Sequence, residues 1–230
     1  SLTSVAIPSS VTSIGNSAFY ICPGLKEINV DPQNPAYSSV DGVLFNKDRS
    51  VLIAFPGGWV GDYTMPAGVI MVEFYAFEDC PNLTGVTVPD SVTYIAPFAF
   101  SLCGALGGIY FQGDAPAADP TAFSGDHVIV YHLPGKTGWD STFAGAPTAL
   151  WFLPQPILLS GRGNVGAQTN GFGFIISWAT NTSVVVEASS TLADLSWLPV
   201  QTNLLVNGVA VFNDPQWTNF LVRFYRVRPQ

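Results

Sequence analysis

Charged side chains are scarce in this sequence of 230 residues. They make up 10% of the chain, against roughly 25% in a typical soluble domain. Ser, Thr, Asn, Gly, Pro and aromatic side chains must therefore form most of the surface, and such a surface offers little charge repulsion to keep copies of the chain apart. Apolar residues make up 48% of the chain, which is enough for a sizeable core.

Long apolar segments are missing as well. No apolar run approaches the roughly 20 residues that a membrane-spanning helix needs, so we expect no membrane span. The sequence contains no signal peptide, and we expect that any targeting segment has been removed or lies outside these residues.

Basic residues are rare in the first two thirds of the chain. Residues 1–153 contain 13 acidic and 4 basic residues, a net charge of −9, whereas residues 154–230 contain 3 acidic and 4 basic residues, a net charge of +1. Binding to nucleic acid needs clustered Lys and Arg, so no nucleic-acid partner is expected. The basic run Arg223, Arg226 and Arg228 alternates with apolar residues, which is typical of a strand with one charged face.

Residues for metal or nucleophilic chemistry are few. Cys22, Cys80 and Cys103 form no C-x-x-C motif and have no nearby His pair, which argues against zinc. Each follows an Ala-Phe pair at the same offset, so we predict buried free thiols, with a Cys80–Cys103 disulfide as the alternative. The only histidines, His127 and His132, flank a predicted strand on opposite faces. We predict no catalytic residues, no metal and no cofactor.

Three carboxylates of one repeat need a separate evaluation. Glu73 and Glu78-Asp79 lie close together in the sequence, and paired carboxylates can serve a glycosidase. Corner residues of a repeat are more often simply solvated, and this is the interpretation that we favour. The aspartates Asp114, Asp119 and Asp126 lack the spacing of a calcium-binding loop.

A pattern of 23 residues repeats along the first part of the chain. The motif Leu-x-x-Val-x-Ile, with apolar variants, starts at residues 2, 25, 60, 83 and 106, in steps of 23, 35, 23 and 23. A fixed period of this length indicates a solenoid, and the alternation within the motif is typical of a strand with one buried face. We therefore predict a parallel ladder of short strands. Recurring Ala-Phe pairs predict a packed column beside it: Ala18-Phe19, Ala76-Phe77, Ala99-Phe100 and Ala122-Phe123.

The 35-residue step and the last repeat depart from the pattern. Gly42–Phe45 and Val51–Phe55 flank Asn46–Arg49, which predicts a β-hairpin inserted where the Ala-Phe corner should be. We expect this hairpin to project from one edge of the solenoid as a binding loop, or else to pad an irregular repeat. Three large side chains after residue 123 are expected to cap the end of the stack: Trp139, Phe143 and Trp151.

These residues carry a family resemblance. The segments "LTSVAIPSSVTSIGNSAFYICPG" and "LTGVTVPDSVTYIAPFAFSLCGA" resemble the BspA-like leucine-rich repeat of bacterial surface proteins. The hairpin segment "VDGVLFNKDRSVLIAFP" and the closing segment "YHLPGKTGWDSTFAGAPTALW" are similar to variants in the same family. The resemblance covers residues 1 to about 151. It implies an extracellular or cell-surface protein used in adhesion or protein binding, without catalysis, and it implies no particular ligand.

The remainder of the chain has a different character. Residues 152–163 mix Pro and Gly and are expected to be a linker. Short alternating segments separated by turn signals follow, and they predict a small antiparallel β-sandwich over residues 164–230. It resembles a C-terminal module of secreted proteins from environmental bacteria, and is similar in outline to fibronectin type III and Ig-like domains. The predicted fold class is therefore mostly β, a leucine-rich-repeat solenoid over residues 1–151 followed by this sandwich.

The sequence begins inside a repeat motif, with no capping segment before it. We therefore expect apolar side chains of the first repeat to face an uncovered side, where a head-to-tail contact would build a filament or sheath. Exposed Trp and Arg side chains complete the candidate interaction surface: Val5, Ile7, Val11, Ile14, Phe19, Trp59, Trp217, Arg226 and Arg228. The expected function is a secreted, non-enzymatic structural or adhesion protein whose partner is protein, above all a second copy of itself. The alternative is a surface module that binds a glycan or a partner protein.

Overall fold

The computed structural model describes residues 2–15, 17–151, 153, 156–159, 165–168, 171–192 and 197–230. The chain divides into two compact units, Ser1–His132 with Lys136–Ala149, and Leu133–Gly135 with Leu150–Gln230. Each unit has its own hydrophobic core. Within the described residues, no helix has the length and apolar character needed to cross a membrane.

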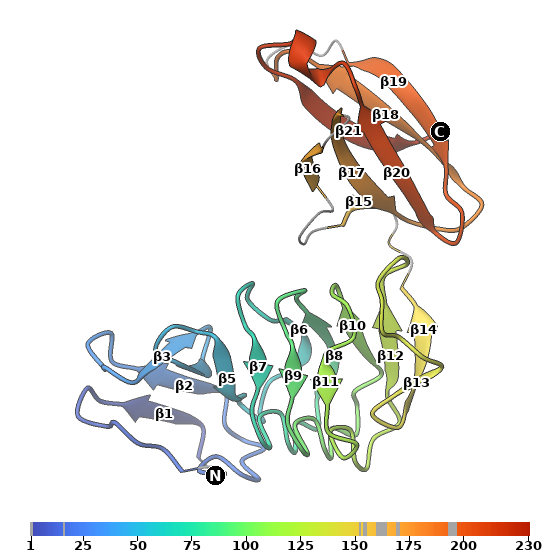
Figure 1. Cartoon of the computed structure of the whole chain (residues 1–230). Coiled ribbons are helices and arrows are strands. Elements are labelled where there is room, and N and C mark those ends of the chain that lie inside the picture. Colours follow the sequence, from blue (N-terminus) through green and yellow to red (C-terminus); the bar gives the residue numbers. More distant parts are fainter. Residues whose placement is uncertain are drawn as a thin grey trace. The chain divides into compact units, whose positions relative to one another are not determined.

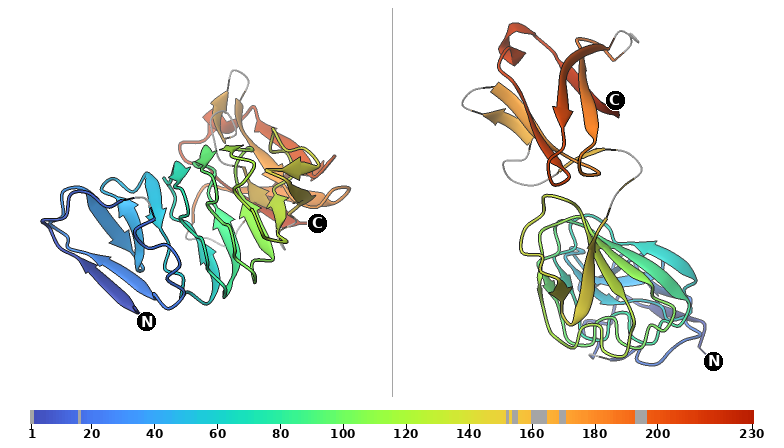
Figure 2. Two further views of the ribbon diagram at one scale, coloured as in Figure 1. Left: turned by 90° about the horizontal axis from the view of Figure 1, so that it is seen from below. Right: turned by 90° about the vertical axis from the view of Figure 1, so that its right-hand side faces the viewer.

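The first unit is a β-solenoid of stacked coils (Figure 1), which can be followed from two further directions in Figure 2. One row of strands comes from the repeating motif: β1 (Ser4–Ile7), β2 (Glu27–Val30), β6 (Gly61–Thr64), β8 (Leu83–Val88), β10 (Gly108–Phe111) and β12 (Ile129–His132). β1 pairs in parallel with β2, and β6, β8, β10 and β12 pair in parallel in that order. The register places Val86 opposite Ile109, one 23-residue period apart. The predicted parallel ladder is therefore confirmed.

A second row of short strands follows the first around each coil. It contains β5 (Val51–Ala54), β7 (Met71–Val72), β9 (Tyr94–Ile95) and β11 (Ala117–Ala118), all paired in parallel. Pro66 and Pro89 lie between the two rows. Because proline has no N–H to donate, it ends the first strand of its coil and lets the chain turn toward the second.

The inserted hairpin is present and pads the irregular repeat, which is the second of the two expectations, whereas the prediction that it projects as a binding loop is wrong. β3 (Tyr37–Val40) pairs antiparallel with β4 (Val43–Asn46), and β4 pairs antiparallel with β5. Val43, Phe45 and Leu52 are fully buried in the solenoid core. Since apolar side chains occupy both faces of β4, projection into solvent would expose them at a cost of roughly 1.5–3 kcal/mol each. The insertion therefore extends the second row of strands.

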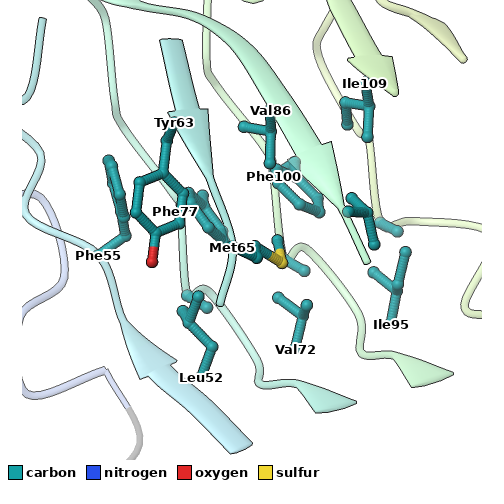
Figure 3. Close-up of a cluster of buried hydrophobic side chains, with 14 of the residues drawn as sticks. Leu52, Phe55, Tyr63, Met65, Val72, Phe77, Val86, Ile95, Phe100 and Ile109 are labelled. Carbon is teal, nitrogen blue, oxygen red and sulfur yellow. The ribbon is translucent and has the colours of Figure 1, made fainter. Parts of the chain in front are cut away.

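The insertion also does not replace the Ala-Phe corner. Ala54-Phe55 takes that position, because the Phe55 N–H donates to the Ala76 carbonyl at 2.7 Å, as the Phe77 N–H does to the Ala99 carbonyl at 2.7 Å. Phe55, Phe77, Phe100 and Phe123 then form one buried column, with ring centroids 4.5, 4.6 and 5.7 Å apart. Figure 3 shows the first three of these rings between the two rows of strands.

Two left-handed residues flank the corners of the third and fourth coils. Tyr75 and Phe98 both have φ 57° directly before an Ala-Phe pair, and four residues later Asp79 and Leu102 have φ 53° and 60°. The fifth coil uses Gly125 at this later position, with φ 87°. These turns direct the Phe side chain inward, although a left-handed conformation costs a non-glycine residue roughly 1–2 kcal/mol.

A short hairpin closes the C-terminal end of the first unit. β13 (Thr142–Phe143) pairs antiparallel with β14 (Ala146–Leu150), which lies beside β12. Trp139 and Phe143 pack against Phe111, with ring centroids 4.9 and 5.6 Å away. The predicted capping role is confirmed for these two residues, whereas Trp151 belongs to the second unit.

The second unit is an antiparallel β-sandwich, as predicted. One sheet is built on β17 (Gly171–Ser177), which pairs with β15 (Ile157–Leu158), β16 (Val165–Gln168) and β20 (Val209–Asp214). The other is built on β18 (Ser183–Ser189), which pairs with β19 (Leu198–Leu204) and β21 (Phe224–Pro229). A short 3-10 turn, η1 (Trp217–Asn219), follows β20. The core includes buried side chains of both sheets: Phe174, Ile176, Val184, Val186, Leu205 and Phe212.

The segment expected as a linker contributes to this sandwich. Ile157 and Leu158 form β15 opposite Ser177 and Ile176 of β17, and Leu159 is buried. Ile157 and Leu159 explain the difference, because their side chains gain more by packing than by remaining in a solvated linker. Residues 152, 154, 155 and 160–163 of the expected linker lie outside the described residues.

Candidate interaction surface

The first coil contains five of the residues predicted to interact. Ile7 is only 5% exposed and packs with Leu25 and Ile28, so the prediction that it faces an uncovered side is wrong. The pairing of β1 with β2 and the packing of Leu44 from the insertion account for its burial. The other four pack against this cluster and are only partly buried: Val5, Val11, Ile14 and Phe19.

The two tryptophans of the candidate interaction surface both have internal contacts. The Trp59 Nε1–H donates to the Asp62 carbonyl at 3.3 Å, and the ring lies 5.3 Å from Phe55. Trp217 lies in η1, partly buried, with its ring centroid 6.1 Å from that of Phe172. Both indoles therefore secure local structure, and neither ring stands free.

The predicted strand with a charged face is β21, and its arginines are paired. Glu187 in β18 is buried and accepts from Arg226 Nε at 2.7 Å and from Arg228 Nε at 2.8 Å. The two guanidinium groups, Arg228 first, hold the pKa of Glu187 below its usual value. Arg226 also lies over the Trp197 ring at 4.7 Å. Local sequence patterns do not predict this cluster of Glu187, Arg226 and Arg228, because Glu187 is separated from the two arginines by 39 and 41 residues.

The structure separates the two histidines and confirms the thiols as free. His132 stacks on Trp139 at 5.0 Å, whereas His127 is exposed beside Asp126. Cys80 and Cys103 are buried free thiols, and the Cys103 thiol donates to the Phe77 carbonyl at 2.9 Å. The hydrogen bond to Cys103 and then burial raise the pKa of Cys80. In the part of the chain that the structure describes, no group of three or more His, Cys, Asp and Glu side chains is arranged to hold a metal.

A hollow of about 460 Å³ lies at the capped end of the first unit. Asp126 and His127 line it together with Ala144–Pro147. Both carboxylate oxygens of Asp126 are buried without a hydrogen bond of normal geometry to any described residue, and burial raises the pKa of this carboxyl to about 6. The sequence contained a signal for the burial of Asp126, because this residue follows Cys80 and Cys103 in steps of 23 residues.

The carboxylates considered for glycosidase chemistry lie on one corner of the third coil. Ser101 Oγ donates to Glu78 Oε1 at 3.3 Å, whereas the buried Oε2 atoms of Glu73 and Glu78 have no hydrogen-bond partner among the described residues. Burial, and to a lesser degree the nearby Asp79, raise the pKa of Glu78, and the Ser101 hydroxyl opposes them. Tyr20 and Tyr75 line the same crevice, with ring centroids 5.8 Å apart.

The sequence profile described as "BspA type Leucine rich repeat region" matches residues 1–50 and 54–137 in six copies. The chain is also similar to a leucine-rich repeat protein from Eubacterium ventriosum, with 25% identity and a TM-score of 0.44, over 56% of this chain and 42% of that chain. A leucine-rich cell surface protein from Faecalibacterium prausnitzii gives 28% identity and a TM-score of 0.46, over 56% and 42%.

The pneumococcal vaccine antigen PcpA gives 18% identity and a TM-score of 0.40, over 58% of this chain and 51% of that chain. The match thus spans about half of each of these proteins or less. No curated protein matches the chain.

Proposed function

The chain belongs to the BspA-type leucine-rich repeat family, and from this membership we propose that it is a secreted or cell-surface adhesion protein that acts through protein–protein contacts without catalysis. The observation that carries the proposal is the six-fold repeat match, because a solenoid presents a broad, rigid surface on which neighbouring repeats can share one partner. The location outside the cell is part of this proposal and rests on the family.

The contacts that the aromatic rings make within the chain favour a protein over a glycan as the partner. A sugar stacks on the open face of a ring. The Trp59 ring is in contact with Phe55 and Tyr63, and its N–H is occupied by a backbone carbonyl. Trp217 is in contact with Phe172. Glycan binding remains the second candidate, because partly exposed indoles retain some accessible surface.

Adhesion assays with beads that carry the full 230-residue chain test this proposal. The beads are applied to intact cells of the producing strain, to cells treated with protease, and to cells oxidised with periodate. We expect beads to bind intact and periodate-treated cells and to lose binding after protease treatment. Binding that survives protease and is lost with periodate would favour the glycan alternative, and absence of binding to intact cells would contradict the adhesion role.

Self-association is the finer part of the proposal. It is supported by the low content of charged residues, 10%, and by the opposite signs of the net charge in residues 1–153 and 154–230. Sedimentation velocity between about 1 and 100 µM, at low and high salt, measures it. We expect the sedimentation coefficient to rise with concentration and the rise to weaken with salt. A constant monomer value at every concentration would contradict self-association and leave the adhesion role intact.

A further inference from the structure

The corner segments of the first unit form one continuous surface, which we call the corner face and define as residues 17–21, 73–79, 98–102 and 121–125. Backbone hydrogen bonds hold the last three segments side by side, from Asp79 N to Ser101 O at 3.1 Å and from Leu102 N to Ser124 O at 3.4 Å. The first segment joins them through Tyr20, whose ring centroid lies 5.8 Å from that of Tyr75. Four large apolar side chains on this face are exposed: Tyr20 (46%), Ile21 (53%), Phe74 (38%) and Leu102 (54%).

The charge of the corner face has one sign. Its four segments and the residues directly beside them, 14–22, 73–80, 96–103 and 119–126, contain no Lys or Arg. The same segments contain five carboxyl groups: Glu73, Glu78, Asp79, Asp119 and Asp126. Apolar side chains bordered by carboxylates alone suit a partner that is both apolar and cationic.

A shortened corner opens a crevice in this face. Leu52 of the second coil pairs with Val72 of the third coil, so the two residues occupy equivalent positions. Phe55 follows Leu52 by three residues, whereas Phe77 follows Val72 by five. The second coil therefore has no counterpart of Phe74-Tyr75, and a crevice with room for about one water-sized group, about 30 Å³, lies between the first and third coils. Glu73 and Glu78 line it, each with one oxygen that has no partner among the described residues.

The aromatic rings of this face leave little room for sugar stacking. Tyr75 stacks on Phe98 at 5.4 Å with an interplanar angle of 7°, and Tyr20 meets Tyr75 edge-on, at 5.8 Å and 82°. The rings thus cover part of one another's faces and turn edges outward. Aliphatic side chains, including the methylene stems of Lys and Arg, pack well on such a surface while their charged ends reach a carboxylate.

We propose that the corner face docks a basic, apolar segment of a partner protein, with one cationic side chain placed at the crevice between Glu73 and Glu78. A lysine ammonium suits this position, because it is compact and carries three donors. The inference rests on the protein-binding role proposed above and adds the location of the contact and the chemistry of the partner.

Peptide binding to the full chain tests this assignment. The probe is a fluorescent peptide of about twelve residues that repeats Lys-Leu-Ser, and its Glu-Leu-Ser counterpart is the charge control. Fluorescence anisotropy at physiological salt measures the Kd. We expect the basic peptide to bind, and the isosteric double variant Glu73→Gln/Glu78→Gln to weaken it about tenfold. The uncharged change Leu102→Ser should also weaken it several-fold, because apolar contact is lost.

The matched control removes the same two charges elsewhere on the first unit. Glu27 and Asp41 are exposed and lie outside the corner face, so Glu27→Gln/Asp41→Asn should change the Kd less than about twofold. Equal weakening by both double variants, or equal affinity for both peptides, would overturn the assignment. If beads carrying Glu73→Gln/Glu78→Gln still bind cells as the parent does, the corner site fails while the adhesion role stands.

Discussion

At the scale of single residues, Asp126 occupies the repeat position that Cys80 and Cys103 occupy in the two preceding coils. Cys103, one period earlier, donates its thiol proton to the Phe77 carbonyl at 2.9 Å. An ionised carboxylate has no proton to donate, and within the part of the chain that the structure describes both oxygens of Asp126 are buried without a hydrogen bond of normal geometry. Burial therefore raises its pKa to about 6, while the nearby Cys103 N–H and His127 moderate the shift.

We expect Asp126→Asn to stabilise the first unit at neutral pH. Because the pKa of Asp126 in the folded chain, about 6, exceeds its ordinary value of 3.8, the stabilising contribution is complete below pH 4 and is lost as the pH rises through 6. The full shift corresponds to about 3 kcal/mol, and solvent screening of this partly exposed group reduces it to about 1 kcal/mol. Calorimetry should show a Tm about 2–4 °C higher at pH 7.5 and unchanged at pH 4.

Asp119, in the same corner, is the matched control. Its carboxylate accepts from the Thr121 side chain at 2.5 Å and from the Thr121 backbone N–H at 2.9 Å, and these bonds hold its pKa below the usual value. Asp119→Asn should therefore give no gain at pH 7.5. The Tm measurements at pH 7.5 and pH 4 are repeated in a His127→Gln background, which lacks the neighbouring imidazole. A Tm for Asp126→Asn equal to that of the parent at pH 7.5 would refute the prediction.

At the scale of elements, the column of Phe rings joins consecutive coils. Phe100 is fully buried, with Phe77 at 4.6 Å on one side and Phe123 at 5.7 Å on the other. We expect Phe100→Ala to lower the free energy of unfolding by about 3–5 kcal/mol, because it removes the ring and leaves a cavity. Phe74→Ala, at an exposed ring of the preceding corner, should cost less than about 1 kcal/mol. Urea unfolding measures both, and losses of equal size would contradict the proposed role of the column.

The same elements show how far the sequence can predict this structure. The 23-residue period predicts the ladder, because β8, β10 and β12 repeat the same strand in the same register. The burial of β4 is harder to predict, since turn signals around Asn46–Arg49 indicate a hairpin but do not say which surface it packs against. Ala54-Phe55 was missed as a corner because two residues are absent before it. Pairs such as Glu187 with Arg226 depend on strand order, which a local pattern does not contain.

At the scale of the whole molecule, the solenoid and the sandwich differ in net charge and in the size of their hydrophobic cores. All of the excess acidic charge lies in residues 1–153, on a solenoid whose core runs through successive coils. The sandwich has a net charge near zero and a smaller core built around Phe174 and Phe212. If the chain binds a partner as proposed, we expect the electrostatic part of that contact to lie on the solenoid, where salt should weaken the association.

Separate cores should also appear as separate transitions in thermal unfolding of the full chain. Phe212 is fully buried and lies 4.7 Å from Phe174 in the sandwich. Phe212→Ala should therefore lower the Tm of one calorimetric transition, and Phe100→Ala should lower the Tm of the other, because each cavity destabilises the core that contains it. The substitutions themselves assign the transitions, since Phe212 belongs to the sandwich and Phe100 to the solenoid. A single transition that both substitutions shift by the same amount would show that the two cores unfold as one.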